Sequence, residues 1–357
     1  MAVKNCVRPV AAGLGAVVAL MLLIGEAFAS CGSAACFMIT GDEASVQQKG
    51  KLSVDFRYAY TISKLDTGVS GRVAAVDQEK HRIVLNEHKE QRTISETEIL
   101  DVNYGLTDRV TLEVTVPYRR VNHTHFIEVG NANGGSGTFE KFQEAGVGDV
   151  RLTAKYSMLP TLRNLVVTGL GIDLPTGNSS AKNINGILQE PTLQIGRRAY
   201  GIYASMYQSY EVVPHRLNEF TSASYHHSFL NPNNYQFGDE YVLSAGMNLR
   251  MLEVVTLTGQ FNWRYAVHDE FKGSTLESAL FLGDPGFPGD SVVVDPDPKR
   301  RPVPNTGSTM LAFSPGVSVQ VRDNLRAYFF AQIPVARDFN GGLIPDVSYL
   351  TGLSMSF

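Results

Sequence analysis

Hydrophobic and polar residues alternate one by one along several stretches of this chain. In residues 52–62, for example, Phe56 and Tyr58 stand on either side of Arg57, and the same period of two continues in both directions. Successive side chains of a strand point to opposite faces, so each stretch predicts a strand with one apolar and one polar face. The period recurs in residues 110–119, 150–158, 240–250 and 255–265.

The alternation predicts twelve strands joined by connections of two kinds. The expected strands are 50–64, 91–104, 109–125, 147–158, 164–174, 190–198, 200–212, 238–250, 254–267, 307–321, 325–336 and 346–357. Short turns are expected at 105–108, 160–163, 252–253, 322–324 and near 198–199, and long polar connections at 65–90, 126–146, 175–189, 213–236, 268–305 and 337–345. In 200–212 and 325–336 either face could be the outward one.

Short and long connections would then alternate along the chain, which is typical of barrels that cross the bacterial outer membrane. A soluble sandwich has no reason for such regularity. We therefore expect an all-β fold, a single antiparallel transmembrane β-barrel of about twelve strands. The even number of strands places both ends of the barrel on the periplasmic side.

The last strand ends on an aromatic residue. Residues 347–357 alternate in the same way and finish at Phe357. This segment resembles the closing strand of Gram-negative outer-membrane barrels, and the resemblance implies that the barrel-assembly machinery recognises it. The candidate assembly signal is Tyr349, Leu353, Met355 and Phe357. The alternative is the edge strand of an ordinary sandwich.

The N-terminus has the features of a secretory signal peptide. Lys4 and Arg8 precede an apolar stretch over 10–24, and Ala27-Phe28-Ala29 offers a cleavage site. We expect a signal peptide at 1–29, a short periplasmic segment at 30–49, a barrel at 50–357, and export to the outer membrane. Cys31 and Cys36 then lie in an oxidising compartment, which favours a disulfide over a metal site. Phe28 stands where a lipidation motif has Leu, so we expect Cys31 to carry no lipid.

Charged side chains on the polar strand faces are the candidates for lining the lumen. They are Asp55, Arg57, Glu113, Arg119, Arg151, Lys155, Glu240, Arg250, Arg264 and Arg326. Two readings stay open for them, because such charges either select solutes or brace the wall through cross-strand ion pairs. Basic residues predominate in this list, so an open pore would mildly favour anions. The Pro- and Gly-rich connection 268–305 is the candidate constriction, folded inward or standing outward.

No catalytic or cofactor site emerges from the sequence. His123 and His125 share a strand face near the outer rim, and His226-His227 lie in another expected outer loop. Together they could bind a metal, but histidine pairs in exposed loops are usually ordinary polar residues, so we expect no metal site. The chain lacks the motifs of outer-membrane phospholipases and proteases, and we predict neither enzyme activity nor a cofactor. The net charge of −4 argues against nucleic acid as a partner. The expected partners are outer-membrane lipid and lipopolysaccharide, the assembly machinery, and small solutes.

Three segments resemble a known group of proteins. They are Asn103–Val110 followed by Val116-Pro117-Tyr118, Gly146–Leu152, and Gly169–Gly177. Their order and spacing are similar to those of the outer-membrane proteins associated with the meta-cleavage pathway of phenol degradation. The resemblance implies an outer-membrane barrel that serves as a channel for small organic compounds. The alternative function is an occluded structural or partner-binding barrel, such as a scaffold for an electron carrier.

Overall fold

A computed structural model describes most of the chain. The described residues are 38–40, 46–65, 71–128, 137–161, 163–183, 186–278, 291–340 and 342–357. The expected signal peptide and the expected Cys31–Cys36 disulfide lie outside them.

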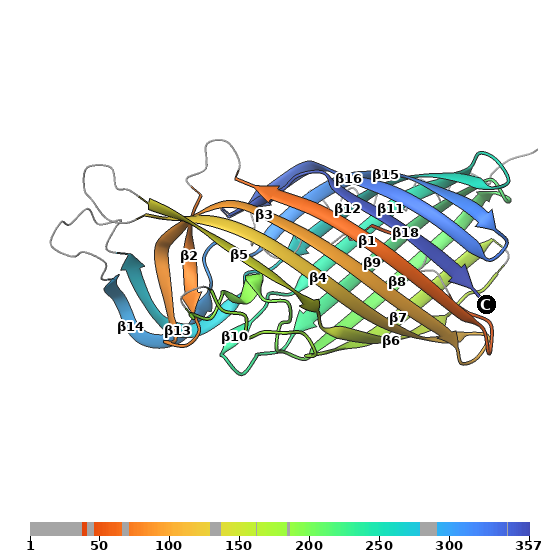
Figure 1. The fold of residues 1–357 in the computed structure, drawn as a ribbon. Coiled ribbons are helices and arrows are strands. Elements are labelled where there is room, and N and C mark those ends of the chain that lie inside the picture. Colours follow the sequence, from red (N-terminus) through yellow and green to blue (C-terminus); the bar gives the residue numbers. More distant parts are fainter. Residues whose placement is uncertain are drawn as a thin grey trace, which may run out of the picture.

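Twelve antiparallel strands close into a barrel (Figure 1). Around the barrel they are β1 (Leu52–Lys64), β3 (Arg82–Gly105), β4 (Val110–Glu128), β6 (Val150–Ser157), β7 (Asn164–Leu174), β8 (Gly201–Val213), β9 (Leu217–Ser228), β11 (Glu240–Arg250), β12 (Val255–Ala266), β15 (Ser308–Arg322), β16 (Leu325–Phe339) and β18 (Ser348–Ser356). The last strand returns to the first, in a register that runs from Ser53 opposite Ser356 to Tyr60 opposite Tyr349. The predicted fold class is confirmed.

The barrel is apolar outside and polar inside. On β7, Leu170 is 71% exposed, and on β12 Phe261 is 52% exposed, while its neighbours Gln260 and Asn262 are 0% exposed. Exposed apolar side chains are unfavourable in water and favourable in hydrocarbon. A closed barrel also satisfies every backbone hydrogen bond internally, as a hydrocarbon environment requires. The exterior is therefore suited to lipid. In the described residues no helix is long and apolar enough to cross a membrane.

Polar and aromatic side chains mark the outer edge of the apolar band. On the outside of the wall, Tyr58 donates a hydrogen bond to Glu96, and Arg120 forms an ion pair with Glu98 at 2.7 Å. Elsewhere around the rim Tyr241 packs against Tyr225 and Tyr265, with ring centroids 5.1 and 6.1 Å apart. Such a girdle is usual where a barrel meets the membrane surface.

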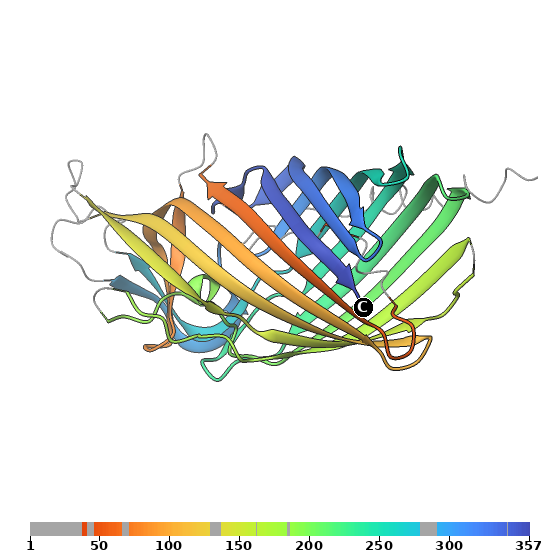
Figure 2. The ribbon, with the colours of Figure 1, turned by 45° about the vertical axis from the view of Figure 1, so that its right-hand side comes forward.

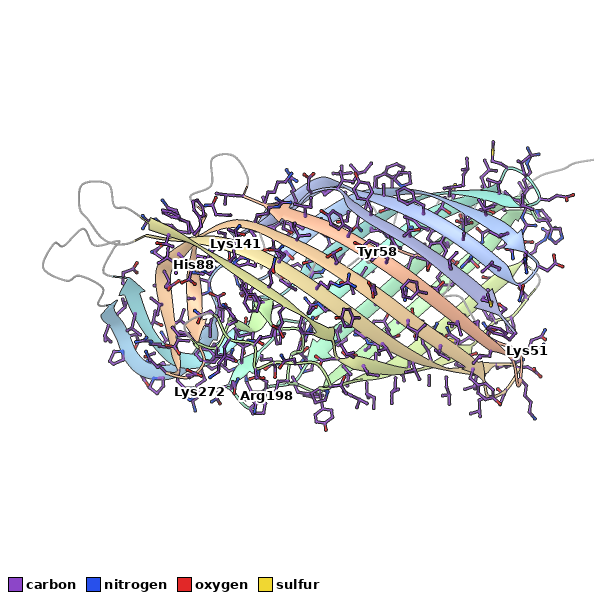
Figure 3. The ribbon with its side chains drawn as sticks, viewed as in Figure 1. Lys51, Tyr58, His88, Lys141, Arg198 and Lys272 are labelled. Atoms are coloured by element: carbon purple, nitrogen blue, oxygen red, sulfur yellow. The ribbon has the colours of Figure 1, made fainter. Side chains whose placement is uncertain are left out.

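The two ends of the barrel differ. The short turns and the C-terminus lie at one end, near Lys51, while His88, Lys141, Arg198 and Lys272 lie at the opposite end (Figures 1, 2 and 3). Short turns face the periplasm in outer-membrane barrels. We call the Lys51 end periplasmic and the other end extracellular.

One of the predicted strands is wrong. Residues 190–198 do not pair; they contain a single 3-10 turn, η1 (Pro191–Leu193), and the expected turn near 198–199 is absent. The missing strand is β9, within the connection predicted at 213–236, and the tight turn lies at 214–216. The alternation in residues 190–198 predicted a strand wrongly, because Leu193 and Ile195 are buried against Val121 and are not exposed to lipid.

The two ambiguous strands resolve clearly. On β8, Ile202 and Met206 are exposed on the outside, and Tyr207 is buried inside. On β16, Tyr328 and Phe330 are buried within the barrel, and Phe329 is exposed.

Predicted extracellular loops contain further strands. These are β2 (Arg72–Asp77), β5 (Gly137–Val147), β10 (Tyr235–Gln236), β13 (Glu270–Ser278), β14 (Ser291–Pro302) and β17 (Ile344–Pro345). The connections expected at 65–90 and 268–305 meet here, because β13 pairs in parallel with the start of β3. A small core of Ala74, Val76, Ile83, Tyr235, Phe271 and Val303 holds this extension together. It projects from one side of the extracellular end (Figures 1 and 2).

Candidate functional site: the barrel lumen

Among the described residues, the lumen of the barrel contains two large cavities. The periplasmic cavity has a volume of about 420 Å³ and is bordered by residues at the short turns, including His215 and Glu253. The extracellular cavity has a volume of about 400 Å³ and is lined by charged residues of β3, β4, β6, β11 and β12. Both volumes are in the range of small-molecule sites.

The N-terminal residues Met38, Ile39 and Thr40 cross the lumen between these cavities. Ile39 borders both cavities, and all three residues are buried. This corrects the expectation that 30–49 is a periplasmic segment, since its described residues 38–40 lie within the barrel. Residues 46–50 do lie at the periplasmic end, where Gly50 donates a backbone hydrogen bond to Gly105.

Apolar patches on opposite walls hold the crossing segment. Met38 packs with Ala59, Tyr328, Phe330 and Leu350 on β1, β16 and β18. Ile39 packs with Val167, Tyr207 and Phe220 on β7, β8 and β9. These two groups of strands lie on opposite sides of the ring. Hydrophobic side chains facing a polar lumen are costly unless covered, so the wall is built to receive this segment.

Gln260 fixes the segment from a third side. Its side-chain oxygen accepts a hydrogen bond from the Ile39 backbone N–H, and its amide donates one to the Ile39 carbonyl, both at 3.0 Å. Asn262 supports Gln260 by donating to its side-chain oxygen at 3.1 Å, and Ser314 in turn donates to Asn262 at 2.8 Å. The polar face of β12 thus acts as a docking edge for residues 38–40.

Most charges of the extracellular cavity are paired across strands. Arg57 contacts Asp101 and Asp55, and Lys155 binds Glu113 at 2.5 Å. Arg151 holds Asp173 through two hydrogen bonds of 2.6 and 3.1 Å, while Arg197 and Arg264 share Glu240 at 2.6 and 2.9 Å. Cross-strand pairs of this kind brace the wall and leave little free charge on it.

Arg119 is placed differently. Its guanidinium donates to the backbone carbonyls of Gln194 and Ile195, at 3.4 and 3.1 Å. These carbonyls belong to the connection 175–200, which folds into the lumen. Asp149 anchors that connection by accepting hydrogen bonds from the backbone N–H groups of Gly177 and Arg197.

The predicted lumen residues lie in three places. Arg57, Glu113, Arg119, Arg151, Lys155, Glu240 and Arg264 border the extracellular cavity, and Arg250 and Arg326 border the periplasmic one. Asp55 is fully buried in the wall, where Tyr328 donates to it at 2.6 Å. None of the described residues in 268–278 and 291–305 borders either cavity, so the narrowing comes from 38–40 and 175–200 instead.

Several lumen residues were missed from the sequence. Asp101, Asp173 and His226 complete the charge network: His226 contacts Asp173 at 2.5 Å and accepts from Arg197 at 3.1 Å. Asp173 lies in the predicted strand 164–174, whose inward face was not assigned from the sequence. Asp101 has the inward parity of its strand and could have been found. His226 could not be found, because its strand, β9, lacks the apolar alternation that predicts a strand.

The four histidines considered from the sequence are not brought together. His226 lies in the lumen, and His227 faces Asp239 at 2.6 Å. His123 and His125 lie beside His88 and Glu90 in the part of β3 and β4 beyond the apolar band. In the described part of the chain, no group of three His, Cys, Asp or Glu side chains is arranged to hold a metal ion.

Glu190 packs beside this histidine cluster, on the connection 175–200. Burial, together with the nearby carboxylates of Glu90 and Glu87, raises the pKa of the Glu190 carboxyl to about 7, against the opposing charge of His88. Glu190 is 3.9 Å from His88. The carboxyl thus titrates near neutral pH, outside the membrane.

Comparison with known proteins agrees with this architecture. The crystal structure of the COG4313 outer membrane channel from Pseudomonas putida F1 superposes with a TM-score of 0.55 at 12% identity, over 89% of this chain and 98% of that one. The chain has the fold of an outer-membrane β-barrel. The CymD monoaromatic hydrocarbon channel (TM-score 0.41, 10% identity, 94% of this chain and 95% of that one covered) and a Pseudomonas aeruginosa FadL homologue (TM-score 0.39, 12% identity, 94% and 99% covered) are more distant. No family model and no curated protein sequence matches the chain.

Proposed function

We propose that this barrel is an outer-membrane channel for the passive movement of small molecules. The observation that carries the proposal is a pair of cavities, one toward each end of a lipid-compatible barrel, separated by only three described residues. A path of this kind needs no energy source, since the width of the lumen and its charges set the barrier to passage. Small solutes, rather than polymers, suit cavities of this size.

The charged residues of the lumen favour a wall braced by ion pairs and a pore with a mild preference for anions. The extracellular cavity is bordered by six Arg or Lys residues and five Asp or Glu residues. Pairing cancels most of this charge at short range. We therefore propose a weak anion preference, with structural bracing as the main role of Arg57, Arg151, Lys155, Arg197 and Arg264.

Residues 38–40 act as the gate in this proposal. They cross the lumen in the described conformation, so passage requires them to shift. The contacts that hold them are two hydrogen bonds to Gln260 and apolar packing of Met38 and Ile39, which add to a modest free energy. Such a segment can open on a thermal timescale without unfolding the barrel.

Liposome swelling tests the proposal. Purified full-length protein is reconstituted into liposomes, which are diluted into isosmotic solutions of monosaccharides and of small organic acids. A channel predicts swelling with small solutes that falls off with solute size, with organic anions entering somewhat faster than cations of equal size. Swelling no faster than in protein-free liposomes, by a barrel whose heat-modifiable migration shows that it is folded, would contradict the channel.

The second candidate function is an occluded structural or partner-binding barrel. The crossing of the lumen by residues 38–40 favours it, because a permanently held segment would block solutes. Affinity capture from an outer-membrane extract, with an electron carrier recovered and no swelling, would support this alternative.

Three finer proposals accompany the channel. The resemblance to the meta-cleavage pathway group supports small aromatic compounds as solutes. The outward placement of Tyr349, Leu353 and Phe357 on the closing strand supports recognition by the barrel-assembly machinery. The apolar exterior supports contact with lipid and lipopolysaccharide.

A further inference from the structure

Among the described residues, Arg119 differs from the other cations of the extracellular cavity because it makes no salt bridge. Among the residues that the structure describes, Arg57, Arg151, Lys155, Arg197 and Arg264 each lie within 4.0 Å of a carboxylate oxygen. Arg119 has only the carbonyl oxygens of Gln194 and Ile195, which both accept from one of its terminal nitrogens. The carboxylates of Asp149 and Glu240 act on Arg119 from beyond salt-bridge distance, and removing an arginine from water without an anion in direct contact is costly.

The guanidinium retains donors that can meet an anion. A guanidinium carries five N–H donors in a rigid plane, and its fork matches the two oxygens of a carboxylate. The bonds to Gln194 and Ile195 use one nitrogen, so they orient the group without occupying the rest of the fork. The anchored connection 175–200 thus holds the side chain in place.

The surroundings of Arg119 are apolar as well as charged. Pro117, Ile99 and Val242 border the same cavity, together with Ile195 from the inward connection. With a volume of about 400 Å³, the cavity accommodates a whole small organic molecule. An inorganic ion would use the charge and leave the apolar surface exposed to water.

We propose that the extracellular cavity binds a small organic monoanion, with its carboxylate on Arg119 and its hydrocarbon part against Pro117 and Ile195. The inference rests on the proposed function, because it places a solute site on the proposed path above the gate. It goes beyond that function by naming the solute class and the residue that recognises it.

Equilibrium binding tests the site without any need for current or transport. Isothermal titration of the full-length protein in detergent uses benzoate as the probe, benzyl alcohol as its uncharged analogue, and inorganic phosphate as an anion without a hydrocarbon part. The variants are Arg119→Gln and Arg119→Lys. Arg322→Gln, at the exposed turn between β15 and β16, is the matched control.

The site predicts that benzoate binds the wild type and the control equally. Arg119→Gln weakens benzoate by about tenfold or more, as expected for the loss of a hydrogen-bonded charge pair. Arg119→Lys keeps the positive charge and loses the planar fork, so we expect it to bind benzoate with an intermediate affinity. It replaces Arg119→Gln as the test variant if Arg119→Gln does not fold. Benzyl alcohol and phosphate bind more weakly than benzoate.

Three results would overturn the site: equal benzoate binding by Arg119→Gln, no benzoate binding by the wild type, or phosphate binding as tight as benzoate. Because binding is measured without transport, failure of the channel proposal gives a different result, namely benzoate binding without liposome swelling.

Discussion

At the scale of single residues, parity within a strand predicted which way side chains point, but not which neighbours they meet. Arg57 and Arg151 were found from the alternation alone, whereas their partners Asp101 and Asp173 required the register between strands. Gln260 was inward by parity, yet its role depends on a segment more than two hundred residues away in the sequence. Parity is local, and partner choice is set by tertiary structure.

Gly196 gives a test at this scale. It lies against Gly177, so that a Cβ on Gly196 would be 2.4 Å from the Gly177 carbonyl oxygen. Gly196→Ala is expected to displace the connection 175–200, at a cost of about 1–3 kcal/mol, because neither backbone can yield without losing the Asp149 anchor. Hydrogen exchange should rise in residues 176–197 and stay unchanged in the barrel strands.

Gly259→Ala is the control for this change. A Cβ on Gly259 would be 3.8 Å from Phe313, an ordinary contact. Equal exchange in both alanine variants would show that the close approach of Gly177 and Gly196 is not required.

At the scale of elements, strong apolar alternation located eleven of the barrel's strands, and a weak outward face concealed one. The outward positions of β9 include Glu219 and Thr221 near its start, so the strand has little apolar alternation. The segment 190–198 was wrongly predicted as a strand for the opposite reason. Leu193 and Ile195 alternate as in a strand, but they are buried within a folded connection. Burial by a folded loop and burial by lipid look alike in a sequence.

The connection 175–200 is expected to loosen as the pH rises toward neutrality. The pKa of Glu190 is raised from 4.5 to about 7 in the folded protein, so its neutral form is the stabilising one. Stability of the connection therefore falls between about pH 4.5 and about pH 7 and is constant above. The pKa of His88 is raised by Glu87 and Glu90 despite burial, so His88 stays charged over this window.

Hydrogen exchange of residues 186–196, corrected for intrinsic rates, measures this effect at about pH 5.5 and about pH 8. Protection should be greater at the lower pH in the wild type and nearly equal at both in Glu190→Gln. An unchanged pH dependence in Glu190→Gln would assign the titration to another group.

At the scale of the whole molecule, the sequence predicted the closed barrel, its even strand number and its inverted polarity. It did not predict that residues 38–40 enter the lumen or that the extracellular connections form a small core of their own. Both features depend on contacts between segments far apart in sequence, such as Met38 with Leu350 and β13 with β3. Local periodicity carries no information on such contacts.

The last residue of the chain lies at the seam where the barrel closes, and we propose that its side chain promotes assembly. Phe357 is exposed on the outside, and its backbone N–H donates to the Leu52 carbonyl at the seam between β18 and β1. Phe357→Ser is expected to lower the amount of protein assembled in the outer membrane severalfold, while purified protein still refolds in detergent. Membrane fractionation and heat-modifiable gel migration measure the two outcomes.

Phe139→Ser, at an exposed position on β5 outside the closing strand, is the control. Normal assembly of Phe357→Ser would show that the aromatic C-terminal residue is not needed for insertion of this barrel.

In the proposed channel residues 38–40 are the gate, and single-channel recording shows whether they are. Gln260→Ala removes both hydrogen bonds to Ile39, each worth about 0.5–1.5 kcal/mol, and Gln143→Ala on the exposed face of β5 is the control. We predict brief openings of the wild type and of Gln143→Ala, and an open probability roughly tenfold higher for Gln260→Ala. Folded Gln260→Ala barrels that pass no current, or that open as rarely as the wild type, would contradict the account.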